Sequence, residues 1–146
     1  MALLQEGEKM MGLNELAEKV HKTAKEKGFY KPLSNWMDLR NQVEEKVRVM
    51  CSPEYQEFFM TLIEQHERDF LNAFRLAQIA LIHAELSEAV QADRDGNIEL
   101  FNEEFGADVI IQILSVSKAF GIDNDYEVEK KMDKNEDRPL LHGRKY

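Results

Sequence analysis

The feature that most constrains this chain is the stretch from Leu81 to Leu114, LIHAELSEAVQADRDGNIELFNEEFGADVIIQIL, where carboxylates interrupt two apolar segments. Aliphatic side chains recur around Glu85 and directly after Asp108, which is typical of α-helices that are buried on most sides. The Asp95-Gly96 pair between the two segments predicts a tight turn. Because an unpaired buried carboxylate is costly, acids in such helices indicate nearby partners. We therefore expect an antiparallel helix hairpin with acids between its helices.

Four carboxylates form two pairs in this hairpin. Glu85 and Glu88 are three residues apart and Glu104 and Asp108 are four apart, so each pair shares one helix face. With Gly96 at the turn, the four positions fall at similar heights along the hairpin. Close anions raise one another's proton affinity unless a cation neutralises them, and oxygen-only ligands favour Mg²⁺ or Mn²⁺ over zinc or copper. Solvated surface acids are the commoner origin of such spacings, but the aliphatic flanks favour a metal site.

The remaining sequence predicts an all-α protein, a helical bundle built around this central hairpin. At 146 residues, with only seven Gly and three Pro, the chain fits one domain over residues 1–146 with a sizeable core. Residues 1–12 are expected to be flexible. Start and stop signals predict helices over residues 14–27, 36–50, 53–67, 72–92, 97–120 and, capped by Asp123 or Asn124, up to about residue 135.

Charge and cysteine content exclude several classes of protein. The net charge of −9 argues against nucleic acid as the main partner, because binding phosphate backbones needs a basic surface. The single Cys51 excludes an internal disulfide and fits a reducing cytoplasm. The N-terminus has no signal-peptide pattern, and the apolar runs are too short to predict a membrane span. Lys130 to Tyr146 holds six Lys or Arg against three Asp or Glu, enough local positive charge to hold a triphosphate.

Three motifs in order resemble the MazG-like family of all-α nucleoside triphosphate pyrophosphohydrolases. The first is LNELAEKVHKTAKEKGFY, residues 13–30, which is similar to the family's opening helix. The second is Glu85-x-x-Glu88 followed by an acidic pair ending in Asp108. The third is KMDKNEDRPLLHGRKY, residues 131–146, which is similar to the closing K-M-x-x-N-x-x-R-P-x-x-H-G-[KR] segment. Residues 31–69 fall outside the resemblance and look like inserted helices.

The resemblance implies a function and a set of residues for it. It implies magnesium-dependent hydrolysis of a nucleoside triphosphate to the monophosphate and pyrophosphate, in the cytoplasm, by a homodimer or homotetramer. The metal ligands implied are Glu85, Glu88, Glu104 and Asp108, with Glu88 or Glu104 as the group that activates water. Lys131, Asn135 and Arg138, spaced four and three apart, are expected to bind the substrate's phosphates, although a solvated helix end has the same composition.

One departure from the family pattern concerns the second acidic pair. The family's usual spacing is Glu-x-x-Asp, but the residue three before Asp108 is Phe105, and the nearest acid is Glu104, four before. Gly106 or a local π-bulge would help the cluster to survive this shift. Two alternatives stay open: a related pyrophosphatase acting on a substrate such as phosphoribosyl-ATP, and a non-catalytic helical interaction module with a degenerate acidic cluster.

Overall fold

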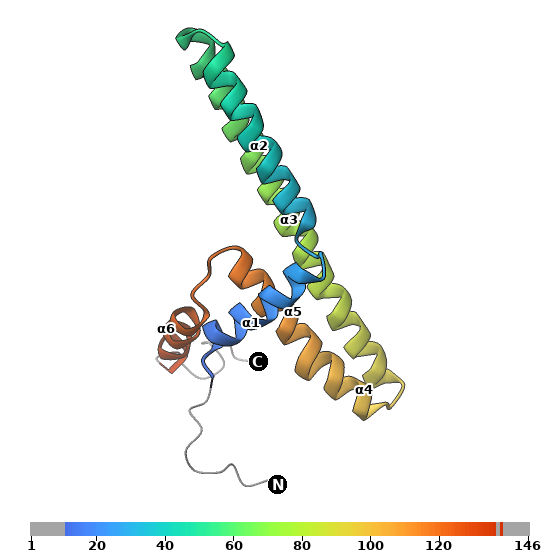
Figure 1. Ribbon diagram of the computed structural model, residues 1–146. Helices are drawn as coiled ribbons and strands as arrows, with labels where there is room; N and C mark the ends of the chain where they lie inside the picture. Colours follow the sequence, from blue (N-terminus) through green and yellow to red (C-terminus); the bar gives the residue numbers. More distant parts are fainter. Residues whose placement is uncertain (1–10, 137, 139–146) are drawn as a thin grey trace. The chain divides into compact units, whose positions relative to one another are not determined.

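The computed structural model describes residues 11–136 and 138, and every regular element within them is helical (Figure 1). This confirms the all-α class. The helices are α1 (Leu13–Glu26), α2 (Lys31–Met50), α3 (Pro53–Arg94), α4 (Ile98–Glu103), the π-helix η1 (Glu104–Asp108), α5 (Val109–Ala119) and α6 (Asn124–Glu136). Contacts divide the chain into two compact units, which are described separately. One unit is Thr23–Ile110, and the other comprises the residues on either side of it. The single domain and the flexible N-terminus stay predictions, the latter because residues 1–10 lie outside the described part.

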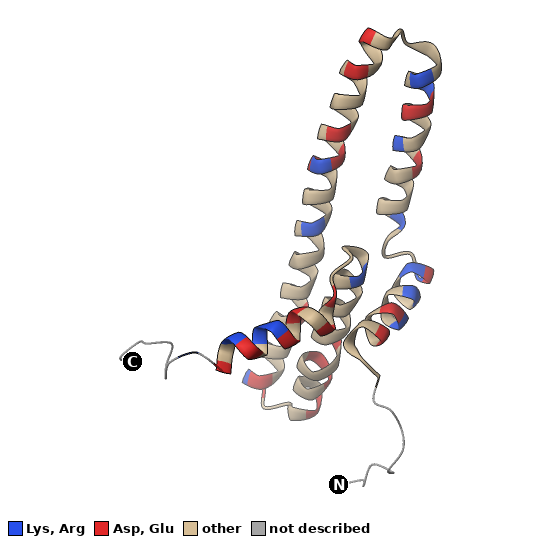
Figure 2. Cartoon of the chain, turned by 90° about the vertical axis from the view of Figure 1, so that its left-hand side faces the viewer, with Lys and Arg blue, Asp and Glu red and all other residues tan. Residues whose placement is uncertain are grey.

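The long helix α3 replaces two predicted helices. A break was expected between Glu67 and Asn72, but the helix runs unbroken for 42 residues. No Gly or Pro occurs from residue 54 to residue 95, so nothing in the backbone forces an end there. Phe70, within the expected break, stacks on Trp36 of α2 with ring centroids 4.7 Å apart. This packing holds α2 against α3, as Figures 1 and 2 show.

The helix α2 begins five residues earlier than predicted. Trp36 was expected to start it, because Pro32 disfavours helical angles at Lys31. The observed helix starts at Lys31, with Tyr30 at the N-cap and the proline in the first turn. A proline is tolerated there because its missing N–H would have no partner within the helix. The buried Tyr30 ring lies 6.1 Å from that of Phe74 and fixes this end of α2 on α3.

A glycine turn joins α3 to α4. Gly96 has φ +68°, a left-handed conformation that side chains other than glycine's rarely adopt. The N–H of Asn97 donates to the carbonyl of Ala92 at 2.9 Å, which closes the end of α3. The Asn97 side chain then accepts from the N–H of Leu100 at 3.1 Å and caps α4. The chain therefore reverses here, and α4 and η1 pack against α3.

In the second unit, the first turns of α1 and α6 cap each other. Asp125 accepts a hydrogen bond from the N–H of Asn14 at 3.2 Å, and the Asn14 side chain accepts one from the N–H of Asn124 at 2.7 Å. Asp123 accepts from the N–H of Tyr126 at 3.0 Å and from the Asn14 amide at 2.7 Å. Asp123 or Asn124 was predicted to cap this helix, and Asp123 is the residue that does so. These bonds satisfy backbone donors that both helix starts would otherwise leave open.

Candidate metal centre

Two of the predicted ligands lie on α3, on the face that packs against α4. Glu85 and Glu88 lie one turn before Ala89 and Ala92, which are almost completely buried. Alanine side chains are small, so the backbones of the two helices approach closely at this point. The same approach brings the glutamates of α3 to the neighbouring helix. Glu85 and Glu88 therefore lie between the two helices of the hairpin, as the sequence predicted.

The third predicted ligand, Glu104, opens the π-helix η1. The N–H of Val109 donates to the carbonyl of Glu104, five residues before it, instead of to a carbonyl four before. Such a turn holds one residue more than an α-helical turn. A local π-bulge was one of two features, with Gly106 as the other, that were named from the sequence as able to preserve the cluster, and the structure contains a π-helix here. A Cβ added at Gly106 would meet nothing within 4 Å, so the glycine is not required by crowding.

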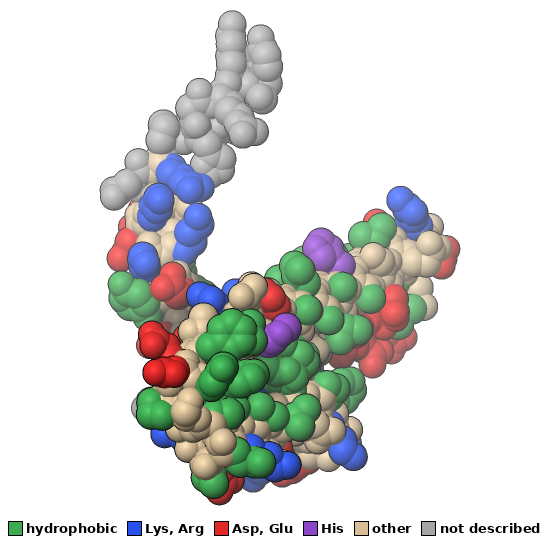
Figure 3. Space-filling model, turned by 90° about the horizontal axis from the view of Figure 1, so that it is seen from above, with side chains coloured by type: hydrophobic (Ala, Val, Ile, Leu, Met, Phe, Trp, Pro, Cys, Tyr) green, Lys and Arg blue, Asp and Glu red, His purple; other side chains and the backbone are tan. Residues whose placement is uncertain are grey.

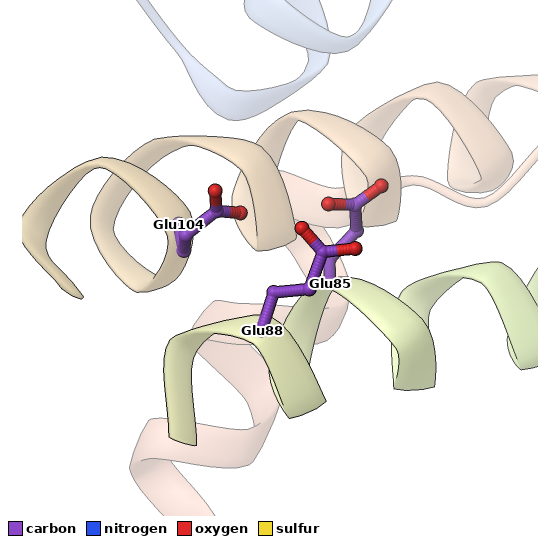
Figure 4. A group of neighbouring side chains, drawn as sticks. All are labelled: Glu85, Glu88 and Glu104. Carbon is purple, nitrogen blue, oxygen red and sulfur yellow. The ribbon is translucent and has the colours of Figure 1, made fainter. Parts of the chain in front are cut away.

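The side chains of Glu85, Glu88 and Glu104, here called the acidic cluster, converge between α3 and η1 (Figure 4). One carboxylate oxygen from each of the three lies within 4.8 Å of the other two. Glu85 and Glu104 are half-buried, and Glu88 is exposed. Three acids from two helices therefore share one small space that opens to solvent on the Glu88 side.

The surroundings of Glu104 disfavour its ionised form. Burial raises the pKa of Glu104, and the negative charges of Glu88, Asp108, Glu85 and Glu103 raise it further, in that order. Its Oε2 atom is enclosed and accepts no hydrogen bond from the described residues. A carboxylate oxygen enclosed without a donor is unfavourable unless a proton or a cation binds it. The structure thus contains an unsatisfied oxygen where the metal was expected.

Asp108, the fourth predicted ligand, lies apart from the acidic cluster. Its oxygens do not meet the 4.8 Å limit to all three of the other acids. It is half-buried at the far end of η1, and its charge still acts on Glu104. Its role as a direct ligand stays a prediction. In this arrangement it contributes negative potential to the centre.

The donor set fits a hard divalent cation. Carboxylate oxygens are the ligands that Mg²⁺ and Mn²⁺ prefer, and no His or Cys belongs to this group. Oxygens on opposite sides of an octahedral Mg²⁺ lie about 4.2 Å apart. A span of 4.8 Å is slightly wider, so small side-chain rotations would let the three acids share one ion. Glu85, Glu88 and Glu104 are the residues that would hold it.

The predicted phosphate-binding residues lie in the other compact unit. Lys131 and Asn135 are exposed on α6. Arg138 is also exposed, and its N–H donates to the carbonyl of Asn135 at 3.1 Å. Residues 137 and 139–146 of the closing motif lie outside the described part of the chain. The approach of these side chains to the acidic cluster stays a prediction.

An aromatic pair beside the acidic cluster was not predicted. The rings of Phe101 and Phe105 stack in parallel with centroids 5.4 Å apart, and Phe105 is half exposed. Their spacing of four residues was the available signal for this pair. In the sequence, Phe105 was notable only as the residue that replaces an acid.

Among the described residues, no single helix is long and apolar enough to cross a membrane; one bent helix pair, residues 98–119 with 124–136, reaches that length and composition only in combination. In comparisons with known proteins, no family model, curated protein or solved structure matches this chain.

Proposed function

We propose that the protein hydrolyses a nucleoside triphosphate to the monophosphate and pyrophosphate with the help of Mg²⁺. The observation that carries the proposal is the convergence of Glu85, Glu88 and Glu104, with an enclosed oxygen of Glu104 that has no donor. The acidic positions belong to one of three motifs that resemble the MazG-like family. The resemblance suggests the reaction, and the three converging carboxylates offer oxygen ligands for a metal ion.

The π-helix η1 accounts for the departure of Glu104 and Asp108 from the family spacing. An extra residue in a π turn leaves the residues after it in the register of an α-helix that is one residue shorter. Glu104 and Asp108, four apart across η1, therefore correspond to acids three apart on a regular helix. That is the spacing in the family pattern. The departure at Phe105 is then an insertion that the π turn absorbs.

In the proposed mechanism, side chains of this protein bind the metal ion and the phosphates and accept a proton. Glu85, Glu88 and Glu104 would hold Mg²⁺, which would supply positive charge to phosphate oxygens and make water more acidic there. Glu88 or Glu104 would accept a proton from the water that attacks the α phosphate. The bond between the α and β phosphates breaks, and pyrophosphate leaves. Lys131 and Arg138 offset its negative charge, and Asn135 donates hydrogen bonds to its oxygens.

A pyrophosphate-release assay tests the proposal. The full-length protein is supplied with Mg²⁺ and a panel of ribo- and deoxynucleoside triphosphates, with phosphoribosyl-ATP as a further substrate. We expect activity on at least one nucleotide and a loss of about 100-fold or more in Glu88→Gln and Glu104→Gln. Glu103→Gln is the matched control, because Glu103 neighbours Glu104 and is not part of the acidic cluster. The activity of Glu103→Gln should stay within a few-fold of that of the unmodified chain.

Two other results would assign a different function. Activity on phosphoribosyl-ATP alone would place the protein with pyrophosphatases of another substrate class. A folded protein that is inactive on every substrate would be a helical interaction module instead. The position of Asp108 outside the acidic cluster is the observation that favours this second candidate.

A further inference from the structure

Gln78 of α3 is buried although its side chain is polar. Only 6% of this residue is exposed, whereas its neighbours Leu76 and Ile79 are 67% and 40% exposed. Figure 3 shows that other hydrophobic side chains lie at the surface on one face of the chain. A helix that serves only a core turns its apolar residues inward and its amides toward water. Positions that reverse this rule are often functional ones.

The amide of Gln78 forms no hydrogen bond within the part of the chain that the structure describes. A buried amide without a partner is unfavourable, because folding has removed it from most of its contact with water. The enclosed polar atoms without partners do not include either amide atom of Gln78. The small exposed surface of this residue therefore includes the amide. A ligand can reach the amide there and form the missing hydrogen bonds.

Gln78 lies on the same face of α3 as Glu85 of the acidic cluster. The two residues are seven apart, so they lie within about 20° of each other around the helix axis and about 10 Å apart along it. The half-buried Ile82 lies between them on this face. All three residues belong to the unit Thr23–Ile110, so the position of the other unit does not affect their relation.

The separation and the chemistry of the two groups fit the two ends of a nucleotide. A nucleotide whose phosphates meet Mg²⁺ at the acidic cluster extends from it by a sugar and a base, a reach of the same order as the spacing along α3. A glutamine side chain ends in an acceptor oxygen and a donor NH₂ group. Nucleobases present a donor and an acceptor side by side, and glutamine pairs with such an edge through two hydrogen bonds.

We propose that Gln78 binds the edge of the nucleobase and determines which base the protein accepts. This role rests on the proposed function, because the base lies near Gln78 only if the acidic cluster holds the phosphates. The buried position makes the amide selective. A base that lacks the matching groups leaves the amide unpaired, and such a mismatch discriminates more strongly than apolar contacts do. Gln78 is therefore a specificity-determining residue and takes no part in proton transfer.

Calorimetric titration of the full-length protein with nucleotide analogues tests this role. The analogues carry each of the four bases and a methylene group between the α and β phosphates, so they bind with Mg²⁺ and are not cleaved. We expect the unmodified chain to prefer one base at least about tenfold. Gln78→Met, which keeps the length of the side chain and removes the amide, should weaken the preferred analogue at least about tenfold and reduce the preference to within about threefold.

Gln91→Met is the matched control. Gln91 is an exposed glutamine of the same helix, and its amide donates to Asp95 at 2.9 Å. This variant should keep both the affinities and the base preference of the unmodified chain. A further analogue, which lacks the exocyclic group of the preferred base, should bind the unmodified chain weakly. Gln78→Met should not weaken it further, because the variant and the analogue remove the same contact and their effects are not additive.

Thermal melts of the ligand-free protein separate this role from a structural one. Gln78→Met should melt at or above the temperature of the unmodified chain, because an apolar side chain replaces a buried amide that has no partner. A clearly lower melting temperature, or an equal loss of affinity for all four bases, would overturn the role, since a glutamine that only supports the fold would give these results.

Failure of this role and failure of the proposed function give different results. A base preference that depends on Gln78, without pyrophosphate release from the natural nucleotides, would contradict the proposed hydrolysis and support the role of Gln78. Pyrophosphate release with a base preference that Gln78→Met does not change would do the reverse. Equal binding of all four bases by the unmodified chain, or no binding of any analogue, would also overturn the role of Gln78.

Discussion

Ionisation of Glu104 is unfavourable in the acidic cluster in the absence of a cation. Burial and the charges of Glu88, Asp108 and Glu85 all raise its pKa. The unfolded chain separates these acids, so the raised pKa belongs to the folded state alone. Between the ordinary pKa of a glutamate and the raised one, the folded protein therefore holds more protons than the unfolded protein.

This difference predicts a stabilising effect of Glu104→Gln in metal-free protein. The folded protein's stability falls as pH rises from the ordinary glutamate pKa through the raised pKa of Glu104, because ionisation there is unfavourable. Glutamine removes that ionisation. The variant should therefore melt higher than the unmodified chain at neutral pH, and the gain should vanish below the ordinary glutamate pKa. Thermal melts in EDTA across this pH range measure it, and Glu103→Gln, the neighbouring acid, should show a smaller gain.

Asp123 predicts a pH dependence of the opposite sign. Hydrogen bonds from the N–H of Tyr126 and from the Asn14 side chain lower its pKa. Its stabilising contribution is therefore present above the ordinary aspartate pKa and is lost as pH falls through the lowered one. Asp123→Ala should lower the melting temperature at neutral pH, with the difference shrinking in acid. Asp123→Asn, which keeps an acceptor oxygen, should lose less, and an equal loss would contradict the capping role.

At the scale of elements, η1 predicts that one residue can be removed from the hairpin without harm. Deleting Gly106 should convert the π turn into an α-helical turn and leave all later residues in register, since the turn holds one residue in excess. The variant should keep its helical circular dichroism and melt at or above the temperature of the unmodified chain.

The matched control is deletion of Gln112, which lies in the regular helix α5. Removing a residue there rotates everything after it by about 100°, so the buried Leu114 and Val116 turn toward solvent. We expect a lower melting temperature or loss of the cooperative transition. Equal tolerance of both deletions would show that the excess residue in η1 has no structural meaning.

Local signals explain which elements could be predicted from the sequence. Gly96, Asn97 and Asp123 act through their own backbone or side chain, so the turn and both caps were predictable. The continuity of α3 agrees with a local signal, the absence of Gly and Pro from residue 54 to residue 95, which the predicted break overlooked. The packing of Phe70 on Trp36 joins residues 34 apart in sequence, which no local pattern reveals. The positions of the four acids were predicted from helical spacing, and the side chains of three of them converge. Asp108 lies outside this group, which helical spacing did not predict.

At the scale of the whole molecule, the candidate residues are divided between the two compact units. The acidic cluster lies in Thr23–Ile110, whereas Lys131, Asn135 and Arg138 belong to the other unit. All three residues of the acidic cluster lie in one unit, so metal binding can be measured without reference to the other unit.

Metal binding to Thr23–Ile110 alone should be visible as stabilisation of the folded chain. Glu85 and Glu104 are far apart in sequence and converge only on folding, so the unfolded chain offers no comparable site. Once the Mg²⁺ concentration exceeds the dissociation constant, each further tenfold should add about 1.4 kcal/mol to the free energy of unfolding. Denaturant melts at fixed ionic strength measure this, with Na⁺ in place of Mg²⁺ as the control. Glu88→Gln and Glu104→Gln should flatten the response, while Lys131→Gln should leave it unchanged. A response equal in all the variants would mean that Mg²⁺ acts elsewhere, and the acidic cluster would then be solvated surface charge.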